Sequence, residues 1–228
     1  MIKITVPNNN IQERRYIIEI IFNQFLEIEY QIVENQISDS WTIEFENGSK
    51  LIFEDHFFSK YTTDLEYLKL ENIPSNVKFI KNEFLLEEDL PVIYGNDNLE
   101  ISEYKIICGI DIFASSFFML TRWEEHVNKN RDKHNRFPAI ESLAFKNNFL
   151  DRPIVNEYLE MIKKMILKLD NSILFKKYTY KLILTHDVDS PKKYRNLIEN
   201  IRELAVDIII QKSIISALKS FKRQIKYF

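Results

Sequence analysis

The order of hydrophobic and polar residues near the N-terminus predicts a mixed α/β domain. Ile2 to Val6 alternates as a strand does, and Ile11 to Phe25 has helical spacing, with Glu13 and Arg14 away from its apolar face. Glu29 to Val33 then has the composition of a returning strand. The pattern therefore predicts a β-α-β unit at the start of the chain.

A β-hairpin is predicted next. Trp41 to Glu46 and Lys50 to Phe53 flank Asn47-Gly48, the dipeptide that two-residue hairpin turns favour. Further strands are expected at residues 90–95 and 104–108 and a weaker one at 77–80, whereas most of the acidic stretch 57–88 gives no clear pattern. These strands extend the mixed α/β domain well beyond the first unit.

Two helices are predicted in the second half of the chain. Asp111 to His126 is apolar through Leu120 and charged afterwards, which is the pattern of a helix that leaves the core at its end. The second begins after Asp151, with Pro153 in its first turn, and repeats apolar residues at helical spacing to Leu169. Arg136 to Asn148 is expected to be irregular or partly helical.

The distribution of charge predicts how the chain divides into subdomains and argues against nucleic-acid binding. Residues 1–103 contain 8 Lys and Arg against 20 Asp and Glu, while residues 104–228 contain 23 against 14. This change predicts an acidic N-terminal α/β subdomain over 1–105 and a mainly helical continuation of the same domain over 106–178. Nucleic-acid binding is a poor explanation, since the basic residues are scattered and no binding motif accompanies them.

The compartment is predicted from what the sequence lacks. Cys108 is a single cysteine among isoleucines, which excludes an internal disulfide and favours a buried structural thiol over a nucleophile. The N-terminus has no apolar region of secretory length, and no run approaches the ~18 apolar residues of a membrane helix. We therefore expect a cytoplasmic protein with no membrane span.

The residues that suggest chemistry lie in Lys181 to Pro191. Leu182 to Leu184 is a short apolar run that predicts a strand buried on both faces, and the sequence then becomes polar. Along an extended backbone Asp187 and Asp189 point one way and His186 points the other. Two carboxylates would thus share one face at the end of a strand, where α/β folds place their active sites. The alternative is that Asp189 or Ser190 caps a following helix.

The string Thr185-His186-Asp187-Val188-Asp189 resembles the first motif of the polysaccharide deacetylase (NodB homology) family. The resemblance implies that Asp187 is the general base and that Asp189 binds a divalent metal, commonly zinc. Segments upstream, from Gly109 to Glu125, His134 to Pro138 and Arg152 to Val155, look like the N-terminal domain that often precedes this module. Residues 179–228 would then be the first strand and helices of an incomplete (β/α) barrel.

The chain departs from this family in its histidines. The family's second motif is a His-x-x-x-His pair, and no two of the four histidines here, His56, His126, His134 and His186, are four residues apart. Only 37 residues follow Pro191, too few for the rest of a barrel. We therefore expect a truncated module that is inactive alone, with the missing metal ligands on an absent C-terminal segment.

A few other residues suggest binding. An indole stacks well on a sugar face, so Arg122 and Trp123 favour a carbohydrate contact, although packing at a helix end explains them equally well. His134 and Arg136 fit a sugar or phosphate contact, and a loop salt bridge explains them as well. His186 is expected to pack or to support the site without binding the metal, and His56 and His126 lie in no pattern that points to a site.

Two functions are consistent with these observations. The first is the N-terminal portion of a zinc-dependent polysaccharide or glycan N-deacetylase, which hydrolyses acetamido groups of an acetylated amino sugar. The second is a non-catalytic module of surface-polysaccharide biosynthesis that binds a glycan or a partner protein. Metal binding that depends on Asp189 favours the first, and glycan affinity without metal binding favours the second.

Overall fold

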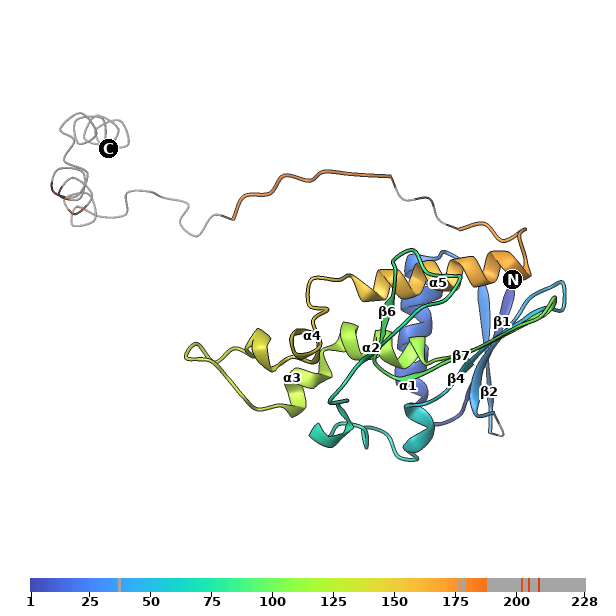
Figure 1. Ribbon diagram of the computed structural model, residues 1–228, viewed down its shortest axis with the longest axis horizontal. Coiled ribbons are helices and arrows are strands. Elements are labelled where there is room, and N and C mark those ends of the chain that lie inside the picture. The colour runs from blue at the N-terminus through green and yellow to red at the C-terminus, as the bar shows by residue number, and fades with distance from the viewer. Residues whose placement is uncertain are drawn as a thin grey trace. The chain divides into compact units, whose positions relative to one another are not determined.

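The computed structural model describes residues 1–36, 38–175, 177, 179–187, 202, 205 and 209. It divides into two compact units, Met1–Lys177 and Tyr178–Phe228. The first unit contains the strands and helices labelled in Figure 1. Of the second unit, residues 179–187 have no regular secondary structure, and Arg202, Ala205 and Ile209 are helical.

The first unit has the mixed α/β character that the sequence predicts. Its strands are β1 Ile2–Pro7, β2 Tyr30–Asn35, β3 Ser40–Glu44, β4 Lys50–Glu54, β5 Lys78–Ile80, β6 Leu90–Val92, β7 Gly95–Ile101 and β8 Lys105–Ile110. Its α-helices are α1 Ile11–Ile18, α2 Ile112–Thr121, α3 Trp123–Val127, α4 Leu143–Lys146 and α5 Ile154–Leu169. Short 3-10 turns cover Phe58–Lys60, Leu70–Asn72 and Ala139–Glu141.

The predicted β-α-β start is confirmed. β1 and β2 pair in parallel, with Ile2 opposite Tyr30, and the helical connection runs between them. The predicted helix differs in one respect, because α1 ends at Ile18 and Glu19–Phe25 continues as a π-helix. Ile21 and Phe22 of this π-helix are buried.

The predicted hairpin is also confirmed. β3 and β4 pair antiparallel, and Phe45 and Ser49 close the turn with a backbone hydrogen bond of 3.0 Å. Gly48 has φ 84° in this turn, a left-handed conformation that costs glycine little. The Asn47-Gly48 pair therefore predicts the turn because glycine adopts this backbone conformation at little cost.

A six-stranded sheet organises the unit, in the order β2-β1-β3-β4-β8-β7. β1, β2, β4 and β8 run parallel to one another, and β3 and β7 run antiparallel to their neighbours. β5 and β6 form a separate two-stranded sheet. The six-stranded sheet is open, with β2 and β7 at its edges. Because β8 belongs to it, the sheet contains residues from both the acidic and the basic part of the sequence.

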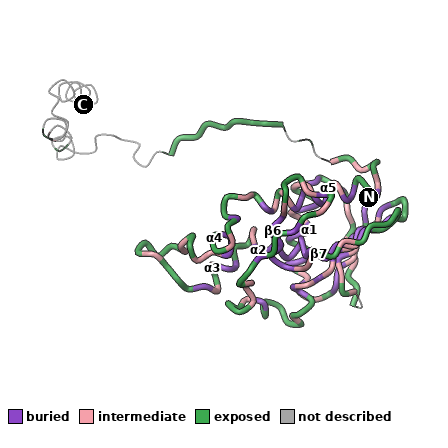
Figure 2. Tube along the Cα trace, viewed as in Figure 1, coloured by how far each residue is buried: buried purple, intermediate pink, exposed green. Residues whose placement is uncertain are grey.

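Helices cover one face of the sheet. The side chains of β1, β3, β4 and β8 alternate between buried and accessible, and α5 contacts β4 and β8 while α1 and α5 both contact α2 (Figures 1 and 2). Phe113 of α2 anchors this interface, since its ring lies 4.5 Å from that of Trp41 and 5.3 Å from that of Phe53. The opposite face carries polar residues such as Lys3 and Thr42, so the unit has two layers.

Cys108 lies in the buried layer, as predicted. Its side chain points from β8 into the core, and burial raises the pKa of the thiol to about 12. A thiol that remains protonated at neutral pH is a poor nucleophile. Cys108 therefore acts as a small core residue.

The helix predicted over Asp111 to His126 forms as two helices. Asp111 caps α2 by accepting a 3.0 Å hydrogen bond from the Ala114 amide. Arg122 has φ 53°, which ends α2 and lets α3 begin in a new direction. The second predicted helix is α5, which starts at Ile154 with Pro153 at its N-cap.

The described structure does not form the strand predicted at Leu182 to Leu184. These residues have no regular secondary structure, and their side chains are exposed, Leu184 by 83% (Figure 2). A buried strand needs neighbouring strands to pair its backbone and cover its side chains. Neither sheet of the described residues includes this segment.

Candidate functional site

The residues of the deacetylase-like motif are only partly described. Thr185, His186 and Asp187 belong to the extended segment 179–187 and are exposed. Asp189, the predicted metal ligand, lies outside the described residues, as does Val188. The convergence of the Asp187 and Asp189 carboxylates stays a prediction from the sequence.

Trp123 is not placed to stack on a sugar. Its side chain is 4% exposed and packs at 5.2 Å from Phe118 and 6.0 Å from Phe57, ring centre to ring centre. The reversal of the chain at Arg122 turns this indole inward and leaves the guanidinium of Arg122 outside. The predicted sugar contact through Trp123 is therefore wrong, because neighbouring side chains already cover the faces of this buried indole.

The predicted residues His134 and Arg136 lie in an exposed loop built around Asp132. Asp132 accepts hydrogen bonds from the amides of His134 and Arg136, at 2.7 and 3.0 Å, and its other oxygen pairs with the Arg136 guanidinium at 3.0 Å. These donors lower the pKa of Asp132, the Arg136 amide most of all. The loop salt bridge is the arrangement observed, and it stabilises the tip of the loop.

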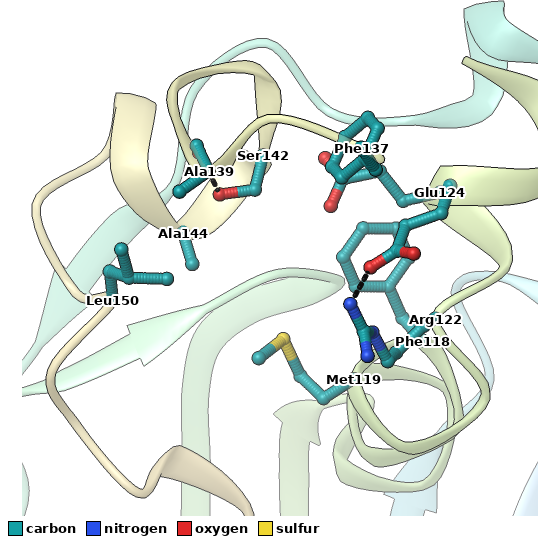
Figure 3. Close-up of a pocket in the computed structure, with 10 residues that line it drawn as sticks. Phe118, Met119, Arg122, Glu124, Phe137, Ala139, Ser142, Ala144 and Leu150 are labelled. Carbon is teal, nitrogen blue, oxygen red and sulfur yellow. Dashed lines mark hydrogen bonds and ion pairs between the residues drawn. The ribbon is translucent and has the colours of Figure 1, made fainter. Parts of the chain in front are cut away.

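A cavity of about 380 Å³ lies between α2, α3 and the segment that leads to α5 (Figure 3). Its volume falls within the range of small-molecule sites. Most of the lining is apolar, and three charged residues contribute to it. The lining residues are Phe118, Met119, Arg122, Glu124, Glu125, Phe137, Ala139, Ser142, Ala144 and Leu150.

Glu124 is the buried charge of this cavity. Its side chain is 9% exposed, and its Oε1 accepts a hydrogen bond of 2.5 Å from the Leu143 amide. Burial raises the pKa of Glu124, although the Leu143 amide opposes the shift. Glu125, by contrast, pairs with Arg122 at the cavity mouth. The cavity therefore offers one buried carboxylate that has no countercharge in direct contact within the described residues.

Replacing Glu124 by glutamine is expected to stabilise the protein at pH 7 and to do so less at pH 4. A folded-state pKa above the unfolded value means that Glu124 contributes stability at low pH and loses it as the pH rises through the folded pKa. Glutamine keeps the acceptor for the Leu143 amide but has no charge to bury. Urea denaturation at both pH values measures the difference, and an equal effect at pH 4 and pH 7 would contradict the prediction.

A polar cluster on the sheet was missed by the sequence reasoning. His56 Nε2 lies 2.7 Å from Glu54 Oε2, and the Asn98 amide donates to Glu54 Oε1 at 3.0 Å. Asn96 lies 3.2 Å from both Glu54 and His56. These donors lower the pKa of Glu54, Asn98 most of all. The alternation of β4 predicts that Glu54 is accessible, but nothing local predicts its contacts with β7.

A buried ion pair lies near the carboxyl ends of β1 and β4. Arg14 and Asp55 are fully buried, with Nη2 2.5 Å from Oδ2, and the Arg14 guanidinium also lies 4.6 Å from the ring centre of Trp41. Asp111 lies at the end of β8, where it accepts hydrogen bonds from the amides of His56 and Phe57 at 2.9 and 3.1 Å. Burial raises the pKa of Asp111, and the nearby Asp55 carboxylate raises it further.

The described residues contain no group of three or more histidine, cysteine, aspartate or glutamate side chains that could hold a metal ion. In the same part of the chain, no helix has the length and apolar character that crossing a membrane requires. The candidate sites of the first unit are thus the cavity and the Glu54–His56 cluster.

Comparison with known proteins gives one match. Residues 2–171 match a family described as "Family of unknown function (DUF7033)". No curated protein and no solved structure matches the chain.

Proposed function

The chain belongs to the DUF7033 family, whose description carries no function, and we propose that it is the N-terminal portion of a metal-dependent polysaccharide or glycan N-deacetylase. In this proposal the family domain, residues 2–171, is the front domain, and residues 179–228 begin the deacetylase module as the first strand and helices of a (β/α) barrel. The observation that carries the proposal is the string Thr185-His186-Asp187-Val188-Asp189, which follows the folded unit directly.

Each aspartate has a separate role in the proposal. Asp187 is the general base, because a carboxylate within reach of the attacking water accepts its proton. Asp189 is one ligand of a divalent metal, most simply zinc, which when bound polarises the acetamide carbonyl. The exposure of Leu182 to Leu184 supports the idea that this strand is completed by neighbouring strands of the module.

The residues of this chain do not complete a zinc site. A hydrolytic zinc site uses three protein ligands and an open position, whereas the motif supplies one carboxylate, and no two histidines have the His-x-x-x-His spacing. The proposal therefore places the remaining ligands on another polypeptide segment.

The proposal is tested on the protein purified from its own cells, with the segments and partners that it carries there. Asp187→Asn is expected to lower the rate of acetate release from N-acetylglucosamine oligomers by about 10²–10⁴-fold with the metal content unchanged. Asp189→Ala is expected to lower the metal content itself. The control is Asp151→Asn, an exposed aspartate outside the motif. Unchanged turnover in both motif variants would refute the proposal.

The 228-residue chain by itself is expected to release no acetate from the same oligomers. One carboxylate ligand is too few to hold a catalytic metal. Turnover by the isolated chain that disappears in Asp187→Asn would show that the site is complete without other segments.

A second function is supported by the cavity beside α3. Its aromatic lining and its charged residues suit a non-catalytic module that binds a glycan. Calorimetry with N-acetylglucosamine and glucosamine oligomers, alongside a zinc titration, separates the two functions. Glycan binding without zinc binding favours the module, and stoichiometric zinc binding lost in Asp189→Ala favours the deacetylase.

A further inference from the structure

The cavity beside α3 combines an apolar wall with a single buried carboxylate. From this combination we infer that it binds a protonated primary amine carried on a body with an apolar face. The preference for a cation rests on the charge and geometry of the cavity. The identity of the ligand as a deacetylated amino sugar rests on the glycan functions proposed above.

Among the charged side chains around the cavity, one carboxylate has no ion-pair partner in the described part of the chain. Arg122 pairs with Glu125 at the mouth, and Lys146 pairs with Glu141 at 3.1 Å. Glu124 remains, and no cation of the described residues is within ion-pairing distance of it. The net charge that the cavity presents to a ligand is therefore negative, although Lys146 acts on Glu124 from a distance.

The carboxylate of Glu124 is held in place. Its Oε1 is fixed by the Leu143 amide at 2.5 Å, and among the described residues nothing donates to Oε2. A carboxylate that is nine-tenths buried is costly unless a cation or a set of donors compensates it. Oε2 is thus the atom that an ammonium group would contact.

The wall of the cavity suits the rest of such a ligand. Phe118, Met119 and Phe137 provide aromatic and polarisable surface, and Leu150 lies opposite Arg122 in Figure 3. The C–H face of a pyranose ring packs on aromatic side chains in the way that other apolar surfaces do. An acetylated amino sugar has the same ring but no positive charge, so the cavity should distinguish the two forms.

Calorimetry on the full chain at pH 6, where the amine is protonated, tests the inference with two probes. The tetramer of glucosamine is expected to bind, and the tetramer of N-acetylglucosamine is expected to bind at least tenfold more weakly. Glu124→Gln should lower the affinity for the glucosamine tetramer by about tenfold or more, because a charge-assisted contact is lost. This variant keeps the acceptor for the Leu143 amide, and the urea midpoint confirms that it is folded.

Two further variants complete the design. Glu83→Gln makes the same chemical change at an exposed carboxylate that pairs with Lys168, and it should leave the affinity unchanged. Ala139→Trp fills the cavity from an exposed lining position and should abolish binding without a cost in the core.

The possible results lead to different conclusions. Equal binding of both tetramers, or binding that Glu124→Gln does not weaken, would overturn the amine inference and leave the glycan function standing. Binding of cyclohexylamine that depends on Glu124, without binding of either tetramer, would support the cation site and count against the glycan functions. Absence of binding by all three probes would overturn the inference.

Discussion

Replacing Arg14 by methionine is expected to lower the free energy of unfolding by about 3–5 kcal/mol. Arg14 and Asp55 have fully buried side chains 2.5 Å apart, and Arg14 also donates to Asn9 twice at 2.8 Å. Methionine fills similar space, but among the described residues it leaves the buried Asp55 carboxylate with the Ser59 amide alone as a donor to its side chain. The large effect therefore comes from the charge that remains, and urea denaturation measures it.

The adjacent residue provides a matched control. Arg15 pairs with Glu34 on the surface, where ion pairs contribute little, so Arg15→Met should cost less than about 1 kcal/mol. The double variant Arg14→Met with Asp55→Asn should recover at least half of the loss, because asparagine keeps an acceptor for the Ser59 amide without the charge. Similar losses for Arg14→Met and Arg15→Met would show that the buried pair is not formed.

Gly95→Ala is expected to destabilise the protein by about 3 kcal/mol or more, the second large effect. Gly95 has φ 109°, which side chains with a Cβ rarely adopt. A Cβ there would also lie 2.7 Å from the Asp111 amide nitrogen and closer still to the Gly109 carbonyl oxygen. Both obstacles are backbone atoms at the junction of β7 and β8, so a side-chain rotation cannot relieve the clash.

Gly48→Ala separates the two causes. Gly48 also has a positive φ, 84°, but nothing lies within 4 Å of a Cβ at that position. Its alanine variant should therefore cost only about 1 kcal/mol, from backbone strain alone. Thermal or urea denaturation of both variants gives the comparison, and equal losses would mean that the close approach at Gly95 does not matter.

Periodicity predicted the parts of the fold in which burial alternates. The β-α-β start and the hairpin follow from it because each strand there has one covered face. It failed for β7, which begins Gly95-Asn-Asp-Asn and is an edge strand with mostly accessible side chains. Glycine and asparagine favour turns, so local sequence predicts a loop where this edge strand forms.

Buried charges are the second feature of the fold that the sequence did not predict. Arg14 was predicted to lie away from the apolar face of its helix, whereas the structure buries it. Its partner Asp55 is 41 residues away in the sequence. Only the tertiary fold brings these groups together, so no spacing rule finds them.

The candidate site was predicted in part for the same reason. The sequence singled out Arg122 as a binding residue, and it does line the cavity, but its neighbour Trp123 faces the core. The left-handed backbone at Arg122 decides which of the two points outward. A left-handed backbone is uncommon for residues other than glycine, so the local sequence does not predict it at Arg122.

The irregular pairing of β7 affects how this protein behaves at high concentration. The register of β7 against β8 shifts between Gly95 and Leu99, and Asp97 and Glu100 place negative charge along that outer strand. A distorted, charged rim is a poor template for a strand from another molecule. Molecules of this protein are therefore discouraged from joining rim to rim into fibrils along this side.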